Sequence, residues 1–318
     1  MKKYEPIMKC DYGPLSPKVC LDPDYFIGFD PAHRKEIVAK EACFYRSITD
    51  AFSVDDRLEK KYVTFPSYDG AETKMKYYKP LKEGGSRPAW IFIHGGGFKT
   101  CSVETHDFVP SYVAANADVV AFSVEYRLAP EYKFPTAVYD CYEAVRWVID
   151  HAEEFGIDTD RISVGGDSAG GNLSAAITIL AKERGNLKID KQVLIYGAFD
   201  SAGVTDEFKT SPKVYPPIGG KQPAGEDSRS QYAGTADRKN PLLSPICAPD
   251  HSGLPNALFI EAECDPLVDD GLIYAKVLQD AGVPVECHIY KGVPHAFILR
   301  TYRETFDALD TICNFLKA

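Results

Sequence analysis

The 318-residue chain lacks the long apolar run that a membrane-spanning helix requires. Such a helix needs roughly eighteen or more consecutive apolar residues, and the apolar stretches here are much shorter. Lysines stand near the amino terminus, but no apolar segment follows them, so we do not expect a secretory signal. We therefore expect a protein without a membrane span that is located in the cytoplasm.

Paired cysteines are also missing. The nine cysteines include no C-x-x-C pair, so neither a zinc knuckle nor a thioredoxin-type site is suggested. An odd number of scattered cysteines is most simply explained by free thiols in a reducing compartment. Each of them is expected to be a small buried apolar residue.

Positive charge is in the minority. The 36 Lys and Arg residues are outnumbered by 46 Asp and Glu residues, which gives a net charge of −10. Proteins that bind nucleic acid or anionic membranes usually present an excess of positive charge. We therefore expect neither as the main partner, and the charge balance says little about a small-molecule substrate.

Short apolar runs recur along the chain from residue 90 onward. They cover residues 90–94, 119–124, 193–196, 257–260 and 285–290. Runs that are apolar on both faces are typical of central parallel strands. Between them, residues 137–155, 272–281 and 305–316 carry apolar side chains at helical spacing. Strand alternating with helix predicts an α/β fold with a mostly parallel central sheet flanked by helices.

Other parts of the chain depart from this rhythm. Alternating residues in 62–66 and 74–78 predict an antiparallel strand pair at one edge of the sheet. Residues 1–55 mix aromatics, prolines and charges, which favours short helices and turns. Residues 201–243 are rich in Gly, Pro, Ser and charge, and are too long for an ordinary connection. We expect 1–55 and 201–243 to cap the functional site of a domain spanning 56–318.

A G-x-S-x-G pattern occupies Gly166-Asp167-Ser168-Ala169-Gly170. This pattern holds a nucleophilic serine on a sharp turn between a strand and a helix. A β-prone segment precedes it, and a small, apolar segment suited to a buried helix follows it. Glycines are needed there because side chains would clash with the neighbouring strand and helix. The alternative is an ordinary Gly-rich turn, so other motifs must decide.

His94-Gly95-Gly96-Gly97 directly follows the apolar run that begins at Trp90. Glycines let backbone N–H groups face a ligand. Two such groups can hold the oxygen that becomes negative when a carbonyl is attacked. The alternatives are a flexible loop and a phosphate cradle, and the absence of a G-x-x-x-x-G-K-[ST] pattern weakens the second. We expect His94 to brace this loop by hydrogen bonding.

A nucleophilic serine needs a base, and His295 is the best placed of the seven histidines. It lies in residues 292–297, between the last predicted strand and the last predicted helix. His288 lies within that strand, where a lone histidine is more often structural. The others have polar or helical contexts and are expected at the surface. These are His33, His106, His151 and His251.

The base needs an acid that orients it, and Asp265 is the best candidate. It follows a predicted strand over residues 257–263, and sites gather at the carboxyl ends of parallel strands. Its alternative role is a turn or helix N-cap. Glu263 and Asp269 are rivals, and Asp269 is expected to be the N-cap of the next helix. The order Ser, acid, His along the chain is that of the α/β-hydrolases.

With these motifs in place, the chain resembles the hormone-sensitive-lipase-like family, the H-G-G-G group of α/β-hydrolase carboxylesterases. The matching blocks span roughly residues 90–297 in the family's order. They are His94–Gly97, Tyr126–Glu131, Gly166–Asn172, and Asp265–Asp269 with His295.

The resemblance implies an α/β-hydrolase catalytic domain over 56–318 with a cap from the amino terminus and the insertion. It implies that Ser168 is the nucleophile, His295 the base and Asp265 its orienting acid. The N–H groups of Gly96, Gly97 and Ala169 would form the oxyanion hole, supported by His94, Gly95, Gly166, Asp167 and Gly170. Arg127 and Glu131 would anchor a turn near the site.

The resemblance also implies a serine esterase that acts on short-chain acyl esters of small or aryl alcohols, without cofactor or metal. Amides and acetylated sugars are alternative substrates, because the same triad would cleave them. A ligand-binding relative without catalysis is a further alternative, but such relatives typically lack the histidine that this chain keeps at His295. The oligomeric state is left open by the sequence, and a homodimer is suggested only by analogy with relatives.

Overall fold

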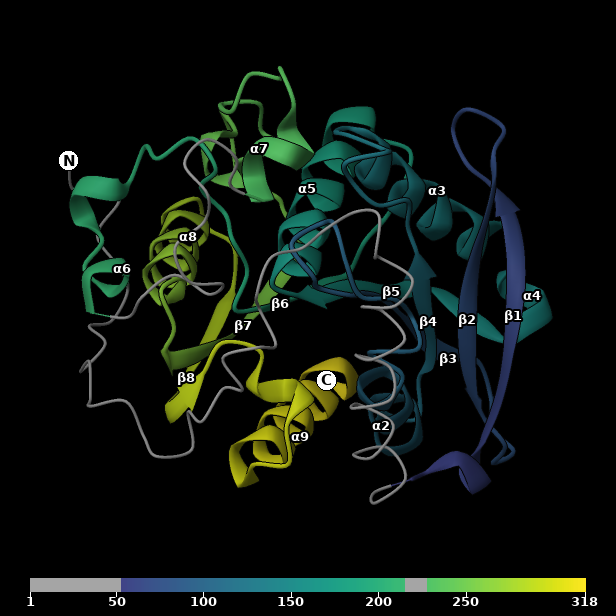
Figure 1. The fold of residues 1–318 in the computed structure, drawn as a ribbon. Helices are drawn as coiled ribbons and strands as arrows, with labels where there is room; N and C mark the ends of the chain where they lie inside the picture. Colours follow the sequence, from purple (N-terminus) through teal and green to yellow (C-terminus); the bar gives the residue numbers. More distant parts are fainter. Residues whose placement is uncertain (1–52, 215–227) are drawn as a thin grey trace.

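The computed structural model describes residues 53–214 and 228–318 (Figure 1). The strands of these ranges form an eight-stranded sheet in the order β1-β2-β4-β3-β5-β6-β7-β8. The strands are β1 (Leu58–Pro66), β2 (Glu72–Pro80), β3 (Arg87–Ile93), β4 (Val120–Glu125), β5 (Ile157–Asp167), β6 (Lys191–Ile195), β7 (Asn256–Cys264) and β8 (Val285–Pro294).

The sheet is mostly parallel, as the sequence predicts. All neighbouring strands from β4 through β8 run parallel, whereas β1 pairs antiparallel with β2, and β2 antiparallel with β4. The expected antiparallel pair is confirmed, with Tyr62 opposite Lys76 and Thr64 opposite Lys74. The five short apolar runs all lie in or directly beside strands.

Helices cover both faces of the sheet (Figure 1). The longer ones are α2 (Phe108–Ala117), α3 (Thr136–Asp150), α5 (Ala169–Arg184), α8 (Val268–Asp280) and α9 (Arg303–Lys317). The shorter ones are η4 (Asp55–Arg57), α4 (Ala152–Phe155), η5 (Asp206–Phe208), α6 (Ser211–Val214), α7 (Ser228–Ala233), η6 (Pro245–Cys247) and η7 (Phe297–Leu299). No helix of the described ranges is both long and apolar enough to cross a membrane.

The core lies on both sides of the sheet because successive side chains of a strand point to opposite faces. Trp90 and Phe92 of β3 pack in the apolar cluster that includes α2 and α9. Ile91 and Ile93 pack in the cluster that includes α3 and α5. α8 lies on the α5 side, in a cluster with β7. This arrangement explains why the central strands are apolar on both faces.

The loops that carry the sequence motifs emerge at the carboxyl ends of the parallel strands. His94 follows β3, Ser168 follows β5, Asp265 follows β7 and His295 follows β8. The predicted insertion lies between β6 and β7, where the described part holds η5, α6 and α7. Residues 1–52 and 215–227 lie outside the described ranges, so the capping role of 1–55 and 201–243 stays a prediction.

The described cysteines are free thiols, and most of them are buried. They are Cys101, Cys141, Cys247, Cys264, Cys287 and Cys313. Within the described ranges this agrees with the free thiols expected from the sequence.

Candidate active site

Ser168 stands on a strained turn between β5 and α5. Its backbone has φ +52° and ψ −114°, a conformation that non-glycine residues seldom adopt. The Ser168 N–H donates to the Ile195 carbonyl at 2.8 Å, which ties the turn to β6. A Cβ added at Gly166 would lie 2.1 Å from the Ile93 carbonyl oxygen, and one at Gly170 would lie 1.9 Å from it. The glycines are therefore required by the close approach of β3, and the expected strand–turn–helix context is present.

Ser168, His295 and Asp265 lie in one hydrogen-bonded line. His295 Nε2 is 2.9 Å from Ser168 Oγ, and His295 Nδ1 is 2.5 Å from Asp265 Oδ2. A carboxylate only accepts hydrogen bonds, so Nδ1 donates to Asp265 and the Nε2 lone pair faces the serine hydroxyl. Asp265 is fully buried, and its Oδ1 accepts the N–H of Leu267 at 2.8 Å. This arrangement suits proton transfer from Ser168 to His295.

The charges around His295 raise the pKa of its imidazole. Burial alone would lower the pKa of His295, but the charge and hydrogen bond of Asp265, with a smaller contribution from Asp167, raise it above its usual value. Ser168 and His295 are partly exposed, whereas Asp265 is fully buried. The site can therefore stabilise an imidazolium formed during a reaction.

The glycine loop after β3 is held in place by contacts of His94 and Tyr126. His94 is buried, its Nδ1 is 2.7 Å from the Gly95 carbonyl oxygen, and its ring stacks on Tyr126 with centroids 4.3 Å apart. The Tyr126 hydroxyl donates to the His94 carbonyl at 2.9 Å. Burial and the neighbouring His106 lower the pKa of His94 to about 3, so its ring is neutral. These contacts are consistent with the bracing role expected for His94, which stays a prediction.

Gly96 and Gly97 occupy the part of the loop that is only half-buried. Their φ values are +110° and +60°, which glycine adopts without strain. A Cβ at Gly96 would lie 2.2 Å from the Thr100 carbonyl oxygen. Ala169, the first residue of α5, follows Ser168 directly and is buried. The groups that could stabilise a negative oxygen thus lie on β3 and β5 loops, next to each other in the sheet.

Residues 90–299 match a family model described as the α/β-hydrolase fold. The chain belongs to the α/β-hydrolase family. It is 38% identical to an arylesterase of Saccharolobus solfataricus over 71% of this chain and 73% of that one. It is 37% identical to an ethyl acetate hydrolase of Pseudomonas putida over 72% of this chain and 73% of that one.

Solved structures agree with these sequence relatives. An esterase of Pyrobaculum calidifontis superposes with a TM-score of 0.84 at 36% identity, covering 96% of this chain and 98% of that chain. A thermophilic carboxylesterase from a metagenomic library superposes with a TM-score of 0.80 at 35% identity, covering 91% of this chain and 97% of that chain. This α/β-hydrolase is a carboxylic ester hydrolase of the hormone-sensitive-lipase-like family.

The two rival acids of this hydrolase have other partners. Glu263 accepts the N–H of Gly292 at 2.7 Å and so supports the end of β8 that leads to His295. Asp269 does not cap α8, because the N-cap residue is Leu267. Asp269 instead lies in the first turn and accepts the Thr210 N–H at 2.6 Å. The expected N-cap role of Asp269 is therefore wrong, because distant backbone groups occupy its carboxylate.

Two histidines expected at the surface are buried, namely His106 at 1% and His251 at 4% exposure. His106 belongs to the site, because its Nε2 lies 3.3 Å from Asp167 Oδ1. Burial opposes ionisation of Asp167, but His106 and the Gly95 N–H hold the pKa of its carboxyl below the usual range. The sequence signal for His106 was only its closeness to the glycine loop. His33 lies outside the described residues.

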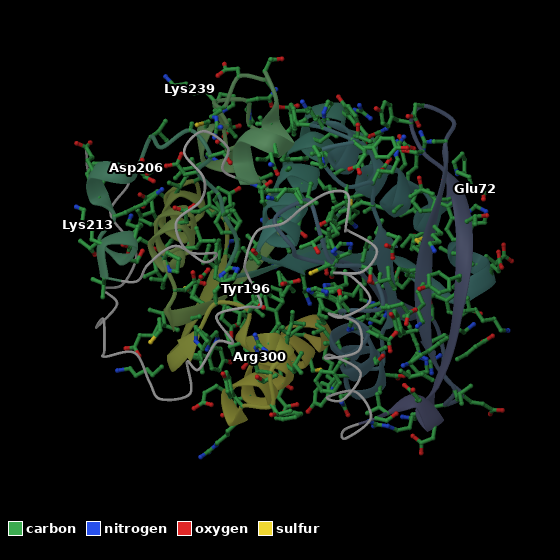
Figure 2. All side chains as sticks on the ribbon, viewed as in Figure 1. Glu72, Tyr196, Asp206, Lys213, Lys239 and Arg300 are labelled. Carbon is green, nitrogen blue, oxygen red and sulfur yellow. The ribbon has the colours of Figure 1, made fainter. Side chains whose placement is uncertain are left out.

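Tyr196, which is labelled in Figure 2, packs against His295 and was not singled out by the sequence. It is fully buried, directly follows β6 and has φ +35°. Its ring lies 4.8 Å from the His295 ring and 5.8 Å from that of Phe297. Strained backbone next to reacting groups is common in enzymes. Tyr196 thus forms an aromatic wall against which the imidazole packs.

Arg127, one of the two residues expected to anchor a turn near the site, lies just after β4. Arg127 Nε is 2.9 Å from Asp140 Oδ2, and Arg127 Nη1 is 2.7 Å from Asp69 Oδ2. These bonds tie the turn after β4 to α3 and to the β1–β2 turn. Within the described ranges, no group of three or more His, Cys, Asp or Glu side chains is placed to hold a metal ion.

Proposed function

We propose that Ser168, His295 and Asp265 form the catalytic triad of this serine carboxylesterase. The observation that carries the proposal is the hydrogen-bonded line from Asp265 through both nitrogens of His295 to Ser168 Oγ. A buried acid, a histidine with fixed tautomer and an accessible serine are the parts that nucleophilic ester cleavage needs.

The first half of the reaction forms an acyl-enzyme. Ser168 Oγ attacks the ester carbonyl carbon while His295 Nε2 takes the hydroxyl proton. The carbonyl oxygen becomes negative, and the N–H groups of Gly96, Gly97 and Ala169 stabilise it. One such donor contributes about 3 kcal/mol or more to the barrier lowering. The C–O bond to the alcohol then breaks, and His295 gives its proton to the leaving oxygen.

The second half releases the acid. Water attacks the acyl carbon as His295 takes one of its protons. The same N–H groups hold the new negative oxygen. The bond to Ser168 Oγ breaks, the proton returns from His295 to the serine, and the carboxylic acid leaves. Asp265 keeps its charge throughout and stabilises the imidazolium in both halves.

The substrate class we propose is short-chain acyl esters, such as acetates, of small or aryl alcohols. The relatives named arylesterase and ethyl acetate hydrolase support this class. We further propose a cytoplasmic protein in which 1–55 and 201–243 cap the site. Among the described strands β8 ends the sheet order, so we propose that its outer edge pairs with a second copy in a homodimer.

A series of p-nitrophenyl esters of increasing acyl length tests the substrate class, together with an anilide and an acetylated sugar. The highest kcat/KM should belong to the acetate or another short ester. The Ser168→Ala variant should lose more than about a thousandfold in rate on every active substrate. Faster cleavage of the anilide or of the sugar acetate would overturn the ester assignment, and undiminished activity of Ser168→Ala would overturn the triad.

A further inference from the structure

A short stretch of the insertion is bonded to the loop that carries Asp265. We call residues 265–270, which run from Asp265 into the first turn of α8, the acid segment. We call Lys209–Ser211, which leads into α6, the clasp. Every residue of the clasp makes at least one hydrogen bond or ion pair with the acid segment, although more than fifty residues separate them in sequence.

Ser211 and Thr210 hold the backbone next to Asp265. Ser211 is buried, and its Oγ donates to the Pro266 carbonyl at 2.9 Å. The N–H groups of Thr210 and Ser211 donate to Asp269 Oδ2 at 2.6 and 2.8 Å. Ser211 therefore holds the Pro266 carbonyl next to Asp265, and Thr210 and Ser211 together hold Asp269 in the first turn of α8.

Lys209 adds a buried ion pair to these bonds. Its Nζ lies 2.6 Å from Asp270 Oδ1 and 3.2 Å from Asp200 Oδ2, and the three side chains are at most 6% exposed. Asp270 Oδ2 also accepts the Phe199 N–H at 3.2 Å. Burial opposes the charge of Lys209, but Asp270 and Asp200 raise its pKa, so the lysine stays a cation.

We propose that the clasp positions Asp265 against His295, so that the insertion sets the geometry of the triad. The inference rests on the proposed function, in which Asp265 orients His295. Asp265 Oδ1 accepts the N–H of Leu267 within the acid segment, so the backbone of that segment determines where the carboxylate lies. Lys209 and Ser211 are positioning residues, because they act through the acid segment and not on the substrate.

The clasp thereby affects the protonation of His295. The groups that face its imidazole are Asp265, Asp167, Ser168 and the Tyr196 ring. Asp265 raises the pKa of His295 most strongly, whereas burial lowers it. If the acid segment shifts, the Asp265 carboxylate moves away from His295 Nδ1. Burial then has the larger effect and lowers the pKa of His295. A loosened clasp therefore lowers both the turnover and the pH at which the base loses its proton.

The test compares Ser211→Ala and Lys209→Met with wild type on p-nitrophenyl acetate, with rates expressed per folded protein from circular dichroism. We expect kcat to fall about ten- to a hundredfold with little change in KM, since small misplacements cost that much. We also expect the acidic midpoint of the pH profile to fall by about half a unit or more. Lys209→Arg keeps the positive charge, so it should retain most of the wild-type kcat and most of the wild-type pH midpoint.

Lys182→Met is the matched control, because Lys182 pairs with Asp250 at the surface and touches neither segment. It should keep the wild-type kcat and pH midpoint. If Lys209→Met does not fold, Ser211→Ala decides alone, because it removes one hydroxyl only. Wild-type kcat and midpoint in folded Ser211→Ala would overturn the clasp proposal. Wild-type enzyme that a fluorophosphonate fails to label at Ser168 would overturn the proposed function instead.

Discussion

The backbone N–H of Gly95 donates a 2.8 Å hydrogen bond to Asp167 Oδ1, across 72 positions of sequence. Gly95 belongs to the glycine loop after β3, and Asp167 immediately precedes Ser168. The bond therefore fixes the proposed oxyanion donors relative to the proposed nucleophile. His106 pairs with the same carboxylate oxygen and holds the acid in place.

Replacing Asp167 should damage turnover more than substrate binding. Asp167→Ala leaves the Gly95 N–H without its acceptor, so the glycine loop can shift away from the negative oxygen. We expect kcat to fall about tenfold or more and KM to change less, since losing one oxyanion donor costs about a hundredfold or more. Steady-state kinetics on p-nitrophenyl acetate measures both. Asp167→Asn keeps an acceptor oxygen and should retain more activity, so equal losses in the two variants would speak against this role.

The pH dependence of kcat/KM should report His295 as the base. The neutral imidazole accepts the serine proton, and Asp265 raises the pKa of His295. Activity should therefore fall as pH drops, with a midpoint above the usual value of about 6.5. In Asp265→Asn, the midpoint should move down and the rate should fall by about four orders of magnitude. A midpoint unchanged in Asp265→Asn would mean that another group titrates.

Glu261 should make the protein less stable as pH rises. Its carboxyl is fully buried on β7, and no described residue hydrogen-bonds to either oxygen. Burial, then the charges of Asp265 and Asp270, raise the pKa of Glu261 well above its usual value. The proton is bound more tightly in the folded state, so stability is full below the unfolded pKa of about 4.3 and is lost as pH rises through the folded pKa.

Glu261→Gln removes this titration while keeping the side-chain shape. Relative to wild type, the variant should gain free energy of unfolding by up to about 1.4 kcal/mol for each pH unit above roughly 4.3, until the native pKa is passed. Urea unfolding at several pH values between 5 and 8 measures the difference. A difference between variant and wild type that stays constant with pH would show that Glu261 is not protonated in the native state.

Gly170→Ala should destabilise the fold far more than Gly185→Ala. A Cβ at Gly170 would lie 1.9 Å from the Ile93 carbonyl oxygen, whereas one at Gly185 meets nothing within 4 Å. Gly185 has φ +65°, so the free energy of unfolding of its alanine variant should fall by only about 1–2 kcal/mol. The Gly170 variant must displace β3 or the turn that carries Ser168, so its free energy of unfolding should fall by several kcal/mol. Urea unfolding of the two variants decides, and similar losses would contradict the required close approach.

The sequence predicted those parts of the site that depend on local patterns. The glycines around Ser168 and those after β3 belong to short sequence motifs, and His295 and Asp265 follow from their places at strand ends. The parallel sheet follows from apolar runs alternating with helical spacing. Such features are visible because each pattern lies within a short stretch of sequence, even where the contact that requires it, such as that of Ile93 with Gly166, is distant.

The errors concern residues whose surroundings come from distant segments. His106 is buried because Phe92, His94 and Asp167 surround it, and none of these contacts is visible in its own flanks. Asp269 binds the backbone of the insertion in place of capping its own helix. Tyr196 packs on a histidine that lies 99 positions later, which no local pattern encodes.

The most direct test of the central claim is to locate the residue that a fluorophosphonate modifies. Treated protein is digested, the adduct is mapped by mass spectrometry, and residual p-nitrophenyl acetate hydrolysis is measured in the same sample. The account predicts a single adduct on Ser168, activity lost in proportion to labelling, and much slower labelling of His295→Ala. An adduct on another residue, or full activity with Ser168 modified, would contradict it.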